Sequence, residues 1–443
     1  MQFNSIPFLF YFLPLFLAAY YLAPEKWRMG ILSFGSLLFY WAASGYRWWS
    51  LGVFAALAAL AFFAGRFLEE KPERRWLLIS VAALTGVLVF FKLYAGGACL
   101  PVGMSFYIFQ MLAYLIDVYR RRLSAERDPV VFAAQAAMFP KLLSGPLMDP
   151  AELQSQTKGP TVGLEKFHSG LQLLILGLGL KVLLANRLGG VWGQAAVVGY
   201  ESISTPFAWL ALVTYSMRLY FDFYGYSLMA VGLGRMLGFE LPMNFLEPYS
   251  AGSVSEFYRR WHATLGRWFR EYIYIPLGGN RQGTGRTILN LAVVWALTGL
   301  WHGVNAGYVL WAMFLCLLIV NERLWLRKYL DRTKVLRHVY TVLVILLSWV
   351  PFALGDFGSI GVFLGRLFHV GAGLGDGRDY VIWFREYVWL MLAGVVFATP
   401  LPKKLWRKVR EHALTDAALF ILFWAVVYFI ATSAQDPFMY FDF

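Results

Sequence analysis

The chain has 443 residues, of which 59% are hydrophobic, 18% aromatic and only 15% charged. Because so little polar surface cannot cover a soluble globule of this length, the composition excludes a soluble protein. It predicts an all-α polytopic membrane protein, organised as a single integral-membrane domain over residues 1–443. The net charge of +13 is distributed in short basic clusters between apolar runs, which indicates membrane topology and membrane lipid contacts, with no nucleic-acid partner.

The first apolar runs lie near residues 6–23, 29–45, 48–66 and 76–94, and each is long enough to cross a hydrocarbon core of about 30 Å. No basic region precedes the first run, so we expect no cleavable signal peptide. Basic residues follow the first and third runs, and the positive-inside rule therefore places the N-terminus outside. A shorter run at 101–119 ends in Arg120, Arg121 and Arg122 and agrees with this orientation.

The middle of the chain is less regular. Residues 130–147 contain Pro140 and a Gly145–Pro146 turn, and they predict a broken or re-entrant segment. Further apolar runs near 168–186, 205–225, 286–301, 304–322, 337–354, 384–400 and 415–432 bring the expected total to about 10 to 12 crossings. The connections 252–286 and 356–379 are too polar to span and are expected to be interfacial or re-entrant.

The first candidate functional stretch, 255–272, is predicted to be one helix, capped by Ser253 or Ser255, with Tyr258 and His262 on a shared face. Its basic residues spread around the other faces. Two interpretations are compatible: an amphipathic helix on an anionic membrane surface, and a basic mouth that binds a phosphate-bearing donor. The donor-binding candidates are Arg259, Arg260, Arg267 and Arg270.

The second candidate is His302, which lies between two apolar runs directly after Trp301. If the helix continues through it, Thr298 and Asn305 share its face, and either one can hold one ring nitrogen. A lone histidine on an apolar face is most often structural, but two histidines with aromatic neighbours at membrane depth favour function. Histidine suits acyl transfer because it exchanges protons near neutral pH. Two distant cysteines predict neither a metal site nor a disulfide.

Several motifs match a known family. They are 101–106 (PVGMSF), 139–146 (FPKLLSGP), 220–227 (YFDFYGYS), 232–238, 241–249 (LPMNFLEPY), 255–281 with its YIPLGGNR ending, 300–303 (LWHG) and the tail 437–443 (PFMYFDF). With these motifs the chain resembles the membrane-bound O-acyltransferases (MBOAT) along nearly its whole length. Within that family it is most similar to the membrane subunit of alginate O-acetyltransferases.

The resemblance implies a helical bundle around a central tunnel or funnel, in the bacterial cytoplasmic (inner) membrane. It places the family's two conserved histidines on His302, as general base or transient acyl acceptor, and on His262, which assists. Asn305 is expected to fix the His302 tautomer. The implied donor is acetyl-CoA, a substrate and not a bound cofactor. The implied acceptor is a secreted or envelope polysaccharide such as alginate, reached through an extracytoplasmic SGNH-type acetyltransferase partner with its own serine nucleophile.

Two alternatives stay open. The D-alanyl transferase subunit of teichoic acid modification shares both histidines and takes its acyl group from a carrier-protein thioester. A non-enzymatic transporter of a lipid-linked saccharide would use the same basic mouth and aromatic lining. Such a transporter would tolerate loss of the His302 chemistry, whereas an acyltransferase would not.

Overall fold

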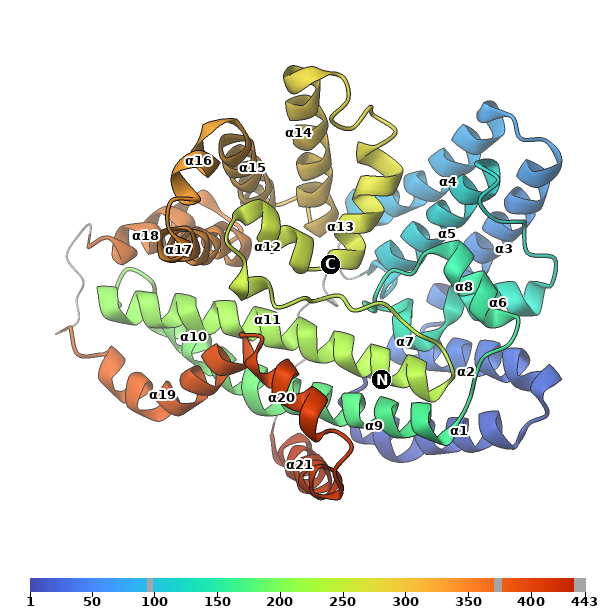
Figure 1. Ribbon diagram of the computed structural model, residues 1–443, viewed down its shortest axis with the longest axis horizontal. Coiled ribbons are helices and arrows are strands. Elements are labelled where there is room, and N and C mark those ends of the chain that lie inside the picture. Colours follow the sequence, from blue (N-terminus) through green and yellow to red (C-terminus); the bar gives the residue numbers. More distant parts are fainter. Residues whose placement is uncertain (94–98, 370–376, 434–443) are drawn as a thin grey trace. The chain divides into compact units, whose positions relative to one another are not determined.

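The computed structural model describes residues 1–93, 99–369 and 377–433, and every regular element in this part of the chain is a helix (Figure 1). Seven stretches of the described residues are long and apolar enough to cross a membrane. They are Trp48–Glu70 (α3), Arg74–Leu93 (α4), Leu164–Val198 (α9 and α10), Ala306–Leu330 (α15 and α16), Lys334–Ala353 (α17), Tyr380–Phe397 (α19) and Ala413–Thr432 (α21). The predicted all-α, multi-pass membrane architecture is confirmed.

Shorter apolar helices accompany these spans: Pro7–Leu22, which ends in α1 (Leu13–Leu22), Met104–Tyr119 (α5) and Phe357–Leu367 (α18). Two further long helices are α11 (Thr205–Met236) and α14 (Gly283–His302). The total number of crossings remains a prediction. The sequence motif at 437–443 lies outside the described residues.

Contacts along the chain define two compact units. The first comprises Met1–Leu178, Gly225–Met243 and the residues from Ile421 onward; the second comprises Gly179–Tyr224 and Asn244–Phe420. Three of the four boundaries fall inside continuous helical stretches: the one that runs from α9 (Leu164–Gly179) to α10 (Asn186–Val198), α11, and α21; the fourth lies in the loop between Met243 and Asn244.

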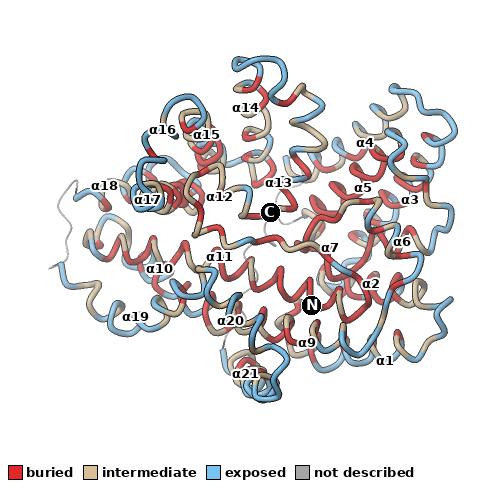
Figure 2. Tube along the Cα trace, in the orientation of Figure 1, coloured by how far each residue is buried: buried red, intermediate tan, exposed pale blue. Residues whose placement is uncertain are grey.

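The first unit is built around α5, which is buried along nearly its whole length (Figure 2). Its other helices include α2 (Arg28–Ala43), α3, α4, α6 (Pro129–Ala137) and α8 (Pro150–Thr157). The predicted break at 130–147 is confirmed, because α6 ends at Ala137 and α7 (Phe139–Leu142) is a single turn. A Cβ on Gly145 would lie 2.4 Å from the Pro140 carbonyl oxygen, so this turn requires glycine.

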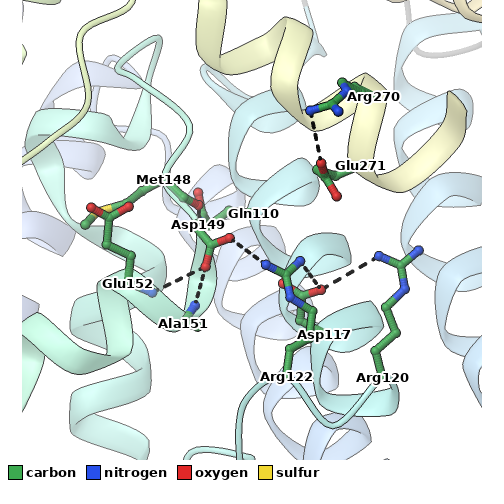
Figure 3. A network of polar contacts seen from close by, with 10 residues as sticks. All are labelled: Gln110, Asp117, Arg120, Arg122, Met148, Asp149, Ala151, Glu152, Arg270 and Glu271. Atoms are coloured by element: carbon green, nitrogen blue, oxygen red, sulfur yellow. Dashed lines mark hydrogen bonds and ion pairs between the residues drawn. The ribbon is translucent and has the colours of Figure 1, made fainter. Parts of the chain in front are cut away.

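Arg122 ties the end of α5 to the start of α8 (Figure 3). Its guanidinium lies 3.2 Å from the buried Asp117 carboxylate and 3.2 Å from that of Asp149. Asp149 also caps α8, because its side chain accepts hydrogen bonds from the Ala151 and Glu152 N–H groups. One member of the tribasic cluster therefore has an internal structural role, in addition to the topological role that the sequence indicates.

The second unit contains α10, most of α11 and the helices from α12 (Val254–Arg260) to α20 (Leu401–Val409). Its inner helices and its outer helices differ in burial. Only 11% of the span window of α19 is buried, although the helix is apolar apart from Arg385 and Glu386, as expected for a helix that faces lipid. By contrast, α11 is buried over most of its length and carries both aromatic and ionisable side chains into the interior.

Candidate functional site

The site lies in the second unit, and its first element is a break in the chain at His262. The helix α12 begins after Ser253, whose side chain accepts a hydrogen bond from the Glu256 N–H at 3.0 Å. It ends before Trp261, and α13 (Ala263–Phe269) begins after His262, which has a left-handed backbone conformation with φ +46°. The predicted continuous helix over 255–272 is therefore wrong, whereas the predicted Ser253 cap is confirmed.

Asn244 explains the break, because it competes with helix formation for the polar groups around His262. Its carbonyl oxygen accepts a hydrogen bond from the Ala263 N–H at 2.9 Å, and the Leu246 N–H donates to the Arg260 carbonyl oxygen at 3.0 Å. The segment that follows α11 thus pairs with the backbone on both sides of His262. Tertiary hydrogen bonds replace the intrahelical ones that a continuous helix would have made.

The Asn244 side chain also fixes the tautomer of His262. The Thr264 backbone N–H, 3.3 Å away, can only donate, so the amide atom that it meets is the oxygen, which also accepts from the Thr264 hydroxyl at 2.9 Å. The same Oδ1 atom lies 3.0 Å from Nδ1 of His262. Nδ1 therefore carries the proton, and Nε2 is the basic nitrogen of the neutral ring.

Burial keeps this ring uncharged. His262 is 4% exposed, and its ring meets Phe223 of α11 edge to face at 4.7 Å between centroids. Because an apolar surrounding penalises the imidazolium form, desolvation lowers the pKa of His262 from 6.5 to about 3. At neutral pH the residue is thus an acceptor of hydrogen bonds through Nε2 and a weak base.

His302 is the last residue of α14 and is 5% exposed. Aromatic side chains surround its ring at centroid distances of 5.1 Å for Trp311, 5.2 Å for Phe352 and 6.0 Å for Tyr308. These residues come from α15 (Ala306–Asn321), which follows α14 directly, and from α17. The apolar environment predicted for His302 is thus made by its own sequence neighbours and by one more distant helix.

Asn305 and Thr298 have other roles than those predicted. The helix α14 ends at His302, so the helical face that we expected the three residues to share does not continue beyond it. Asn305 instead caps α15, since its side chain accepts a hydrogen bond from the Tyr308 N–H at 3.0 Å. The Thr298 hydroxyl donates to the Val294 carbonyl oxygen of its own helix at 2.8 Å. Both side chains therefore hold backbone, not the His302 ring.

Trp301 brings the two histidines together. Its indole centroid lies 4.5 Å from the His302 ring and 6.2 Å from the His262 ring. Residues forty positions apart in the sequence thus contact the same aromatic side chain. Trp301, the residue before His302, thus lies against both candidate histidines.

The four predicted donor-binding arginines fall into two pairs. Arg260 forms an ion pair with Glu256 and donates to the Glu247 carbonyl oxygen, and Arg270 lies 3.6 Å from Glu271 (Figure 3). Arg259 and Arg267 are exposed and have no ion-pair partner among the residues that the structure describes. These two guanidinium groups are the ones available to an anion from solution.

The acidic partner of Arg260 is itself held in the ionised form. Partial burial opposes ionisation of Glu256, but the Gly252 N–H and the Arg260 guanidinium outweigh it, so the pKa of this carboxyl is lowered. Arg260 therefore has a permanent anionic neighbour. This contact helps to stabilise the α12 segment, and donor binding by Arg260 stays a prediction.

Two residues that carry the site were not chosen from the sequence. Asn244 belongs to the LPMNFLEPY motif, but nothing in the motif reveals that it contacts His262. Glu322, buried at the end of α15, accepts hydrogen bonds from the Val254 and Ser255 N–H groups at 2.7 and 3.1 Å, and so anchors the start of α12. The available signal in the sequence was a carboxylate at the end of an apolar run.

Several known proteins are similar to this chain in sequence. The model of the membrane-bound O-acyltransferase family matches residues 109–350. A probable alginate O-acetylase of Pseudomonas putida is 33% identical over the whole of both chains, and that of Pseudomonas fluorescens is 37% identical over 84% of this chain and 76% of its own. A peptidoglycan O-acetyltransferase of Helicobacter pylori is 29% identical over 80% of this chain and 77% of its own. The chain therefore belongs to the membrane-bound O-acyltransferase family and is an O-acyltransferase.

Proposed function

We propose that the protein transfers an acetyl group from cytoplasmic acetyl-CoA towards a hydroxyl group of a secreted or cell-envelope polysaccharide. The observation that carries this proposal is the pair of buried histidines that contact Trp301, found in a chain of the O-acyltransferase family. The named activities of the relatives, O-acetylation of alginate and of peptidoglycan, support a polysaccharide as the final acceptor.

In this proposal His302 is the general base. An acceptor hydroxyl attacks the thioester carbonyl while the His302 imidazole takes its proton; the carbon–sulfur bond breaks, and the proton passes to the leaving thiolate. The outcome is an acetyl ester and a free thiol. The aromatic side chains around His302 support this assignment, because they exclude the water that would otherwise hydrolyse the thioester.

The second histidine would assist without exchanging the proton. Since the pKa of His262 is lowered to about 3, its ring stays neutral, and Nε2 is suited to accept a hydrogen bond from the attacking hydroxyl group and so to orient it. Arg259 and Arg267, which are exposed and form no ion pair within 4 Å in the described part of the chain, would bind the phosphates of the donor.

The same proposal includes the membrane in which the chain lies and its orientation there. We place the chain in the bacterial cytoplasmic membrane with the N-terminus outside, because the basic clusters after the first and third apolar runs and after α5 favour the cytoplasmic side. An extracytoplasmic SGNH-type acetyltransferase would then receive the acetyl group on its serine and pass it to the polysaccharide, such as alginate.

A direct test uses purified protein in vesicles with acetyl-CoA labelled in the acetyl group, supplied together with a polysaccharide acceptor and the extracytoplasmic partner. Thioester cleavage is followed for the native chain, for His302→Ala and His302→Gln, and for a control, His168→Ala, whose histidine makes a side-chain contact with Gln172 in the first unit. We expect cleavage by the native chain and by the control, and a loss of about 10² to 10⁴ in rate in both His302 variants.

The other outcomes separate the alternatives. Cleavage of a D-alanyl carrier-protein thioester, with acetyl-CoA left intact, would favour the D-alanyl transferase reading. Movement of a lipid-linked saccharide that survives His302→Gln would favour transport. Native cleavage of acetyl-CoA that is unchanged in His302→Ala would contradict the role assigned to His302.

A further inference from the structure

The second unit contains a buried ion pair outside the candidate site around His262 and His302. Lys181 and Asp222 form it, and each side chain is only 2% exposed. Lys181 lies in the membrane-spanning stretch Leu164–Val198, and Asp222 lies on α11. Transfer of two charges out of water costs several kcal/mol per ion, so such a pair is a poor source of stability and its presence within a span indicates a functional reason.

The ion pair occurs where the helix changes its geometry. Residues Leu180–Ala185 form a π-helical turn between α9 and α10, and Lys181 lies in its first half. A π-helical turn inserts one residue and rotates everything that follows about the helix axis, and such turns recur at functional sites. The ion pair therefore joins α11 to the point where this rotation occurs.

The same two helices are held in a definite register just before the turn. In the first unit, a Cβ on Gly170 would lie 2.5 Å from the Gly232 carbonyl oxygen, and one on Gly177 would lie 2.5 Å from that of Gly225. Seven residues forward on α9 match seven residues back on α11, as in an antiparallel pair with backbones in close contact. In sequence, Lys181 comes four residues after Gly177 and Asp222 three residues before Gly225.

On α11, Arg218 and Asp222 contact the helical stretch that contains Lys181 and α10, whereas Phe223 contacts His262. Arg218, one turn before Asp222, packs over α10, since a Cβ on Gly189 would lie 2.8 Å from its side chain. Phe223 contacts the His262 ring at 4.7 Å and Phe245 at 5.1 Å. Asp222 and Phe223 are consecutive, so a rotation of α11 that moved the carboxylate would also move the ring that packs on His262.

We propose that the Lys181–Asp222 ion pair positions the acyl-transfer site. It ties Asp222 of α11 to Lys181 in the π-helical turn between α9 and α10, fixes the rotation of α11 about its axis, and thereby holds Phe223 against the His262 ring. Neither residue touches the reacting atoms. The inference rests on the proposed acyl transfer only for its kinetic readout, because the position of the His262 ring is also measurable without turnover.

The test compares Asp222→Asn with a double variant, Lys181→Met with Asp222→Leu, which removes both charges and keeps apolar volume. Three quantities are measured: the unfolding midpoint in detergent, kcat and KM for acetyl-CoA cleavage, and the rate at which diethyl pyrocarbonate modifies His262, read by mass spectrometry. Asp379→Asn is the matched control, because Asp379 bonds Ser204, the residue before α11 begins.

We expect Asp222→Asn to lower the midpoint, because it leaves Lys181 buried without its anion. The double variant should recover the midpoint, while kcat stays about 10²-fold low with unchanged KM and His262 reacts faster than in the native chain. The control should keep native kcat and native His262 protection. Recovery of kcat and protection together with the midpoint would overturn the proposal, since the pair would then only balance charge.

Two provisions keep the test decisive. If the double variant does not fold, Asp222→Glu is compared with Asp222→Asn: His262 protection kept by the carboxylate and lost with the amide supports positioning, and equal protection overturns it. If the native chain cleaves no acetyl-CoA, the proposed function fails, but the modification rate of His262 still decides whether the ion pair positions the ring.

Discussion

Acidification should destabilise this protein through His262 in a measurable way. The folded-state pKa of about 3 lies below the ordinary value of 6.5, so the folded state binds fewer protons than the unfolded state between these values. The contribution is fully present above pH 6.5 and is lost as the pH falls towards 3. At about pH 5 the loss amounts to ~2 kcal/mol, at ~1.4 kcal/mol for each pH unit below the ordinary value.

The assay is SDS titration of the protein in mixed detergent micelles, followed by tryptophan fluorescence, at a series of pH values between about 8 and 5. The reference is His262→Gln, which preserves a polar side chain but cannot titrate. Every other ionisable group is present in both proteins, so its contribution cancels in the difference between their free energies of unfolding.

We expect this difference to shrink by about 2 kcal/mol from pH 8 to pH 5, because only the native chain must keep an imidazole neutral. A difference that stays constant over the range would refute the reasoning. It would mean that His262 is solvated or charged in the folded protein, and the assignment of Nε2 as a permanently neutral acceptor would fall with it.

Three further outcomes follow from the geometry. Glu322→Leu should lower the free energy of unfolding by about 2 to 4 kcal/mol, because the first N–H groups of α12 lose their buried acceptor. The SDS titration measures this change, and a value below ~0.5 kcal/mol would contradict the role of Glu322 in anchoring α12. Gly177→Ala should cost about 1 to 3 kcal/mol in the same assay, since its Cβ would lie 2.5 Å from the Gly225 carbonyl oxygen. Arg259→Gln combined with Arg267→Gln should raise KM for acetyl-CoA severalfold with little change in kcat, measured by thioester cleavage in vesicles; an unaltered KM would remove both residues from donor binding.

The sequence by itself determined the class of the molecule and the residues of interest. Hydropathy fixes which segments enter a bilayer, because every buried backbone group there must be satisfied by a helix. The LWHG and 255–281 motifs identify His302 and His262, and the indole of Trp301 between them belongs to the same motif as His302. These are local properties of composition and order, which do not depend on distant contacts.

Only the tertiary structure decided how those residues are held. The stretch 255–272 has the composition of one helix, yet Asn244 divides it at His262 and fixes the ring tautomer. Local spacing suggested Asn305 as the partner of His302, but the helix ends there and Asn305 caps the next one. Lys181 and Asp222 meet across two helices. The Asn305 cap is a local contact, but the other two outcomes depend on hydrogen bonds and charges brought together from distant parts of the chain, and such long-range competition overrides the local preferences that a sequence displays.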